Sequence, residues 1–101
     1  MSAYIVANLE VADRESFARY VAAAPASVAD YRGEYLVRGG ATELLEGELK
    51  VGRVVILRFP TAAAAMAWYQ SPAYAPLREA RQRAASGPLL ITAGVDEGQA
   101  R

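Results

Sequence analysis

The segment 53-RVVILRF-59, followed by Pro60-Thr61, is the clearest β-strand of the sequence. Its unbroken run of β-branched and aliphatic residues is typical of a strand that is covered on both faces. Pro60 ends the strand, and Thr61 is a suitable N-cap for a helix through residues 62–70. Ser71-Pro72 predicts that this helix bends or begins again before it reaches Ser86-Gly87-Pro88.

The same signals continue in both directions from this strand. Residues 3–10 are rich in strand formers and end before Asp13, a plausible helix N-cap. Apolar residues then recur at helical spacing up to residue 31, with Pro25 predicting a kink or a restart. Residues 34–38 form a second strand, stopped by Gly39-Gly40, and residues 42–46 continue it after a bulge or turn. Residues 89–95 form the last strand.

The resulting order, β-α-β-β-α-β, predicts the α+β ferredoxin-like fold: a four-stranded antiparallel sheet with both helices on one face. We expect one domain over residues 1–96 and a frayed C-terminal tail over residues 97–101. The other face of the sheet is also largely apolar, as Val54 and Ile56 illustrate. We therefore predict a two-fold homodimer with its sheets face to face, the alternative being a monomer with a partly exposed sheet.

The second face also carries a few polar residues, as a ligand cavity would. Four fall on it by alternation: Asn8, Arg38, Arg58 and Thr92. A buried arginine is costly unless it is paired, so Arg38 and Arg58 need partners. Glu10, Glu46 or an anionic ligand could supply them, and an ion pair within the interface is the simpler alternative.

Composition restricts the function classes. The chain has 101 residues, 53% hydrophobic and 22% charged, and a formal net charge of zero. Balanced charge gives no general attraction to nucleic acid or to an anionic membrane. The absence of cysteine and histidine excludes disulfides, thiol nucleophiles, histidine bases and the common zinc sites. There is no apolar run of the ~20 residues that span a membrane and no signal-peptide start, so a cytoplasmic location is expected.

Several strings, in this order, resemble the DUF1330 family, a small bacterial group in the dimeric α+β barrel superfamily. They are Tyr35-Leu36-Val37-Arg38-Gly39-Gly40, Leu45-Glu46-Gly47, the strand ending in Phe59-Pro60, and Trp68-Tyr69-Gln70-Ser71-Pro72-Ala73-Tyr74 with Arg81 following. The resemblance covers residues 4–95 and departs from the family pattern at Arg32-Gly33, where a Gly-Gly pair is usual. It implies the fold and the dimer described above, but no established function.

The family's recurrent polar positions, carried onto this chain, are Arg38, Glu46, Tyr69, Ser71, Tyr74 and Arg81. Structural roles are open for each of them. Ser71 suits an N-cap, the two phenols suit packing at a wet edge, and Arg81 suits an ion pair with Glu46. The functional interpretation groups them into one site, with Arg38, Ser71, Arg81 and Asn8 binding a ligand. In that site Glu46, Tyr69 and Tyr74 would transfer protons.

We therefore expect a cleft for a small anionic or carbonyl-containing molecule, used with no metal and no cofactor. Whether the chain also transforms that molecule, and so is an enzyme, stays open. One alternative is a non-catalytic binding or accessory dimer. A further alternative is cofactor-independent oxygenation, for which Asn8, Trp68 and Thr92 are the residues to follow.

Overall fold

The computed structural model describes residues 1–95, so the predicted tail at 97–101 lies outside the described residues. Strand β1 (Ala3–Val11) is followed by helix α1 (Arg14–Asp30) and by strands β2 (Glu34–Arg38) and β3 (Arg53–Phe59). Helices α2 (Ala62–Tyr69) and α3 (Ala75–Ala84) come next, and then the strands β4 (Ala85–Ser86) and β5 (Leu89–Ala93). The predicted order of elements is confirmed, with the second helix divided into α2 and α3.

All strand pairings are antiparallel, as predicted. Central β1 pairs with β3 on one side and with β5 on the other, while β2 lies at the outer edge of β3. The two-residue β4 was not predicted; it pairs with the end of β1, where Glu10 lies opposite Ser86. The α+β ferredoxin-like fold is confirmed.

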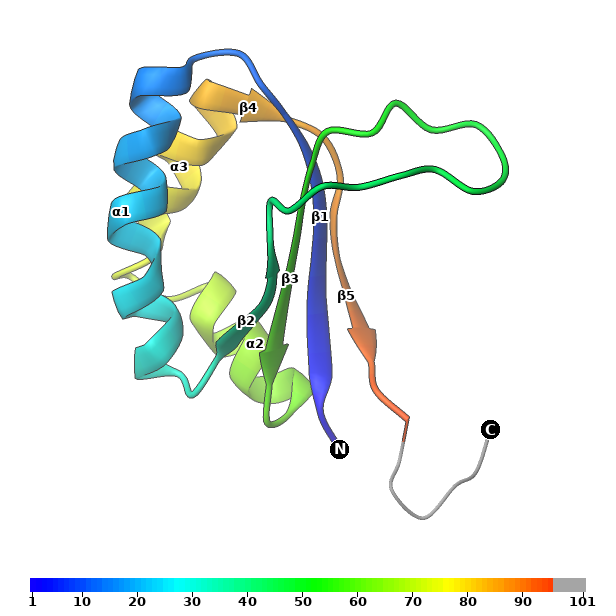
Figure 1. Cartoon of the computed structure of the whole chain (residues 1–101). Helices are drawn as coiled ribbons and strands as arrows, with labels where there is room; N and C mark the ends of the chain where they lie inside the picture. The colour runs from blue at the N-terminus through cyan, green and yellow to red at the C-terminus, as the bar shows by residue number, and fades with distance from the viewer. Residues whose placement is uncertain (96–101) are drawn as a thin grey trace.

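The helices cover only one face of the sheet (Figure 1). Alternate residues of β1, beginning with Ala3 and Ile5, are buried beneath them. Phe59 of β3 packs its ring 5.5 Å from that of Trp68 in α2. Both residues are fully buried, because α2 lies directly on β1 and β3.

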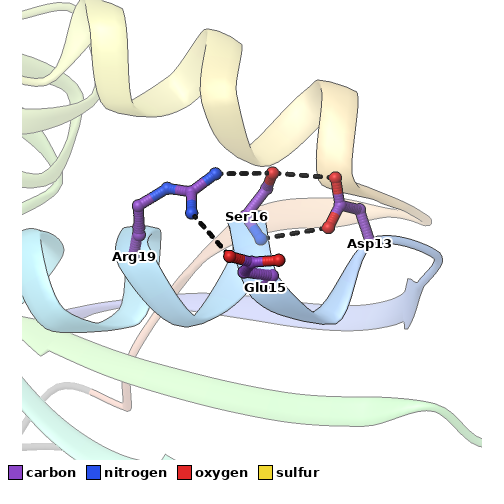
Figure 2. A network of polar contacts seen from close by, with 4 residues as sticks. All are labelled: Asp13, Glu15, Ser16 and Arg19. Atoms are coloured by element: carbon purple, nitrogen blue, oxygen red, sulfur yellow. Dashed lines mark hydrogen bonds and ion pairs between the residues drawn. The ribbon is translucent and has the colours of Figure 1, made fainter.

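The helix starts follow the local signals. Asp13 accepts hydrogen bonds from the backbone N–H and from the hydroxyl of Ser16, and Arg19 reaches the same hydroxyl and Glu15 (Figure 2). Thr61 caps α2 in the same way, through the N–H of Ala64. These side chains satisfy backbone donors that a helix start leaves free.

Helix α1 differs from the prediction of a kink or restart, because it runs without a break through Pro25. A proline removes a single helical hydrogen bond. The residues on either side of it remain helical because they belong to one buried face, which includes Phe17, Ala24 and Val28.

The connection between β2 and β3 also differs from prediction. Residues 42–46 form no strand, and the bulge lies at Leu36, between the paired positions Tyr35 and Val37, rather than at Gly39-Gly40. One extra residue shifts the alternation of a strand. Arg38 therefore lies opposite Val55 on the covered face, and the prediction that it lies on the second face is wrong.

Residues 39–52, called the arm from here on, project from the sheet on the side away from the helices (Figure 1). Asn8 holds the base of the arm by donating to the carbonyl of Lys50, 3.2 Å away, and accepting from the N–H of Gly52, 2.8 Å away. Within residues 1–95 no helix has both the length and the apolar character that crossing a membrane requires.

Candidate functional site

The candidate site is a narrow cleft between the covered face of the sheet and the helices. Its floor is formed by aliphatic side chains of β1 and β3, such as Ile5 and Val55. The cleft encloses about 40 Å³, which is the space of one or two water molecules. Aromatic and cationic side chains provide the rest of its wall: Phe17, Tyr20, Tyr35, Trp68, Arg38, Arg53 and Arg81.

A chain of hydrogen bonds joins α1 to α3 at the inner end of the cleft. The hydroxyls of Tyr20 and Tyr74 lie 2.7 Å apart, and Arg81 donates to the Tyr74 hydroxyl over 3.0 Å. Tyr74 is completely buried and Arg81 is only 6% exposed. Tyr74 and Arg81 are seven residues apart, or about two helical turns, so both side chains lie on one face of the α3 region.

The phenols at the cleft are held in their neutral form. Burial, reinforced by the neighbouring Tyr74, raises the pKa of Tyr20 far above its usual 10.0. Burial likewise raises the pKa of Tyr74, and it raises the pKa of Tyr35 to about 12. At neutral pH these groups can donate hydrogen bonds to a ligand, and they cannot act as bases.

Arg81 remains a cation despite its burial. Desolvation lowers the pKa of the Arg81 guanidinium, but the nearby phenols of Tyr74, Tyr20 and Tyr69 more than offset that effect, so that its pKa is raised. Its hydrogen-bond partner is the phenol of Tyr74, which carries no formal charge. The positive charge at the inner end of the cleft is therefore not neutralised by this contact.

Two further guanidinium groups stand nearer the mouth of the cleft. Arg38, from the end of β2, lies 4.8 Å from the centre of the Tyr35 ring and donates to a backbone carbonyl of α1. Arg53, from the start of β3, lies 5.5 Å from the centre of the Phe17 ring. The Nε of Arg53 is buried and has no hydrogen-bond partner among residues 1–95. A buried donor without a partner is a candidate hydrogen-bond donor for a ligand.

The ion pairs of the described chain lie elsewhere. They join Lys50 to Glu10, Arg58 to Glu34, and Arg19 to Glu15, all at exposed positions. Within residues 1–95 no carboxylate pairs with the arginines of the cleft, and no group of three potential metal-binding side chains is found. The cleft thus combines cations, neutral phenols and an apolar floor.

The sequence model of a family described as "Domain of unknown function (DUF1330)" matches residues 2–95. The chain belongs to the DUF1330 family. This confirms the resemblance on which the site residues were chosen. No curated protein matches the DUF1330 chain.

The solved structures with a fold similar to that of this DUF1330 protein include the two described next. RPA0582 from Rhodopseudomonas palustris, a protein of unknown function, matches with a TM-score of 0.76 and 18% identity, over 94% of this chain and 83% of that one. SnoaB from Streptomyces nogalater, a cofactor-independent oxygenase, matches with a TM-score of 0.66 and 15% identity, over 94% of both chains. At these identities the likeness concerns the fold alone.

Of the family positions, Arg38 and Arg81 line the cleft, and Tyr74 is joined to it through Arg81 and Tyr20. Tyr69 lies beside it, its ring 6.2 Å from that of Tyr74, and faces a separate shallow hollow near β5.

Ser71 is buried, and both of its hydrogen bonds are internal. It donates to the carbonyl of Trp68 and accepts from the N–H of Tyr74. It therefore stabilises the turn between α2 and α3. Helix α3 begins at Ala75 with Tyr74 as its N-cap, so the structural alternative, in which Ser71 is the N-cap of this helix, is wrong in detail.

Glu46 does not reach the cleft of its own chain. It lies in the exposed arm, and the ion pairs expected with Arg38 or Arg81 are not formed among the described residues. The physical reason is the direction of the arm, which leaves the sheet on the side away from the helices (Figure 1).

The residues considered for oxygenase chemistry do not come together either. Trp68 is buried on the helix side, where its indole N–H donates to Ser27. Asn8 lies in the middle of β1, and its side chain holds the base of the arm. Thr92 lies opposite Tyr4 in the alternate set of β1 residues, which faces away from the helices.

Sequence reasoning missed three residues of the cleft: Tyr20, Tyr35 and Arg53. Tyr20 gives no signal of its own, because an aromatic residue at helical spacing is typical of a packed helix face. Arg53 gave a usable signal, because it alternates with Val55 and Leu57 on the covered face of its strand. A charged residue in an inward-facing set is unusual and marks a candidate site.

Proposed function

We propose that this DUF1330 protein binds a small organic anion, a carboxylate above all, in the cleft between α1 and the sheet. The buried guanidinium of Arg81 carries the proposal, since its hydrogen-bond partner is a phenol instead of a carboxylate. Burying a cation without a counter-charge costs several kcal/mol, and an anionic ligand removes that penalty. Carboxylates also suit the planar donor geometry of arginine.

The size and chemistry of the cleft support a carboxylate headgroup. The enclosed space of about 40 Å³ matches such a group and not a whole drug-sized molecule. The remainder of the ligand would lie toward the mouth, near Arg38 and Arg53. The apolar floor and the ring of Tyr35 favour an apolar body there.

Binding is favoured over proton-transfer catalysis at this site. The phenols are neutral at physiological pH, because burial raises the pKa of Tyr20, Tyr74 and Tyr35. No carboxylate of residues 1–95 pairs with the cleft arginines, so the site of a single chain offers donors and no general base. The predicted catalytic role of Glu46 would need the arm of another molecule.

The test compares acetate and benzoate with their neutral amides, acetamide and benzamide, at constant ionic strength. A ligand that binds only the folded chain raises its melting temperature, and the rise grows with the ratio of the free ligand concentration to the dissociation constant. We expect at least one carboxylate to raise the melting temperature while its amide of the same shape does not. Equal shifts for acid and amide, or no shift with either carboxylate, would contradict anion binding.

We also propose that the chain acts as a homodimer, on a separate observation. The face of the sheet away from the helices carries Val6, Ile56 and Leu90 in directly paired positions. The arm projects on the same side and exposes Leu45 at 85% and Leu49 at 55% of their surfaces. An apolar sheet face and an arm with exposed leucines on the same side fit a second copy of the chain.

Sedimentation equilibrium tests the dimer directly. We expect dimers at micromolar concentration for the wild type and dissociation or unfolding for Ile56→Lys, which places an unpaired charge in the interface. Ala22→Lys adds the same charge at an exposed position of α1 and should leave the dimer intact. A monomeric wild type at that concentration would refute the proposal and leave anion binding untouched.

A further inference from the structure

Pro25 changes the hydrogen bonding of α1 directly above the cleft. In an α-helix the N–H of each residue donates to the carbonyl four residues earlier. Proline has no N–H, so Pro25 leaves the Val21 carbonyl without its helical donor. Its ring also crowds that carbonyl. Because α1 continues through Pro25, this free acceptor lies in mid-helix and not at a helix end.

A side chain from the other side of the cleft takes up this free acceptor. The Nη2 of Arg38, at the end of β2, donates to the carbonyl oxygen of Val21 over 3.1 Å. The same guanidinium lies over the ring of Tyr35, 4.8 Å from its centre. Arg38 is thus held between α1 and β2 on two sides, and both Arg38 and Val21 line the cleft.

We propose that Pro25 is a positioning residue for the anion site: it frees the Val21 carbonyl so that this carbonyl anchors the Arg38 guanidinium at the cleft mouth. The inference rests on the proposed anion binding and adds the device that prepares Arg38 for it. Guanidinium has five N–H donors, so one bond to a carbonyl leaves others for a ligand. The anchor fixes the plane of the group, which reduces the ordering required on binding.

The neutrality of the anchor matters for the chemistry. A carboxylate could hold Arg38 as firmly, but it would cancel the charge that attracts an anion. A backbone carbonyl holds the guanidinium and leaves its net charge in place. Arg81, at the inner end of the cleft, also has an uncharged partner, since it donates to the Tyr74 hydroxyl.

The bulge at Leu36 is the second requirement of this arrangement. Without the extra residue, Arg38 would point to the face away from the helices and could not reach α1. The position of the Arg38 guanidinium therefore depends on two features. The bulge in β2 directs the side chain toward α1, and Pro25 in α1 frees the carbonyl that accepts its hydrogen bond. Neither Pro25 nor Leu36 is among the residues of the two core clusters.

The test is a double-mutant cycle with Pro25→Ala and Arg38→Met. The quantity measured is the dissociation constant of acetate or benzoate, whichever binds the wild type more tightly. Alanine restores the N–H that bonds the Val21 carbonyl, and this N–H competes with the Arg38 guanidinium for that oxygen and weakens the anchor. We expect roughly threefold to tenfold weaker binding for Pro25→Ala, the cost of ordering one freed side chain. In the Arg38→Met background, Pro25→Ala should change nothing. Equal effects in both backgrounds would overturn the inference.

Pro76→Ala is the matched control, because Pro76 lies in the first turn of α3, where no helical hydrogen bond is missing. It should leave the dissociation constant unchanged, and a loss equal to that of Pro25→Ala would contradict the positioning role.

A crystal structure of the Pro25→Ala variant gives a readout independent of binding. A guanidinium that stays on the Val21 carbonyl refutes the inference even if no carboxylate binds. If the guanidinium is displaced in the variant but the wild type binds neither carboxylate, the inference about the anchor is upheld and only the proposed function is refuted.

Discussion

Replacing Arg81 with methionine should separate stability from binding. Arg81 is 6% exposed, and its guanidinium donates to the Tyr74 hydroxyl over 3.0 Å. Methionine resembles the aliphatic part of the arginine side chain, ends before the guanidinium group and carries no charge. The substitution removes the burial of a cation and one charge-assisted hydrogen bond, and the two effects oppose each other.

The magnitudes favour the first effect. Burying an ion costs several kcal/mol even after relaxation, while a hydrogen bond to a charged group contributes about 1.5–3 kcal/mol. Tyr74 keeps a hydrogen-bond partner in Tyr20, 2.7 Å away, so no polar group is left alone. We expect Arg81→Met to be neutral or to stabilise the fold by ~1–2 kcal/mol. In a domain of this size, 1 kcal/mol corresponds to a rise of about 4–8 °C in melting temperature.

The affinity for a carboxylate, in contrast to the stability, should fall in Arg81→Met. Losing one buried charge-assisted contact of ~2 kcal/mol weakens binding about 30-fold, at 1.4 kcal/mol for each factor of ten. Urea unfolding with and without benzoate measures both quantities on one sample. Arg83→Met, an exposed position of the same helix, is the control and should change neither.

The reasoning is refuted if Arg81→Met destabilises the fold by more than about 2 kcal/mol, since the guanidinium would then be a structural group. It is equally refuted if the variant retains the wild-type affinity for a carboxylate that the wild type binds.

Three smaller predictions follow from contacts elsewhere in the chain. Burial raises the pKa of Tyr35 to about 12, so above pH 10 the unfolded chain loses its proton first and stability falls between these values; Tyr35→Phe should flatten this decline in urea unfolding. The cap bonds from Ser16 lower the pKa of Asp13 below 3.8, so its stabilisation is lost as the pH falls through the acid range; Asp13→Asn should reduce that acid dependence in thermal melts followed by circular dichroism. Gly33→Ala would place a Cβ 2.6 Å from the Phe59 ring and should cost ~1–3 kcal/mol in urea unfolding, whereas Gly40→Ala, with open space around it, should cost far less.

The fold could be predicted because its signals are local. Asp13 and Thr61 mark helix starts by the chemistry of their own side chains, and both cap a helix in the structure. The apolar run of residues 53–59, ended by Pro60, marks a strand, and the structure forms β3 over these residues with Leu57 and Phe59 buried beneath the helices. Signals of this kind depend on neighbours within a few residues, so a sequence displays them directly.

The candidate site could be predicted only in part. Arg38, Tyr74 and Arg81 were chosen from the family resemblance and are found at the cleft or joined to it. Glu46 was chosen by the same route and lies in the arm, because no sequence pattern states in which direction a long loop leaves a sheet.

What the sequence by itself determined is the order of elements, the antiparallel sheet and its apolar second face, since caps, breakers and alternation are properties of short segments. Only the tertiary structure decided which polar groups meet. Tyr20 and Tyr74 are 54 residues apart in sequence and share a hydrogen bond because α1 packs on α3. Arg38 faces the cleft because a single bulged residue inverts the alternation of β2. Contacts between residues far apart in sequence depend on how whole elements pack, and a one-residue shift in a strand is enough to turn its side chains to the other face.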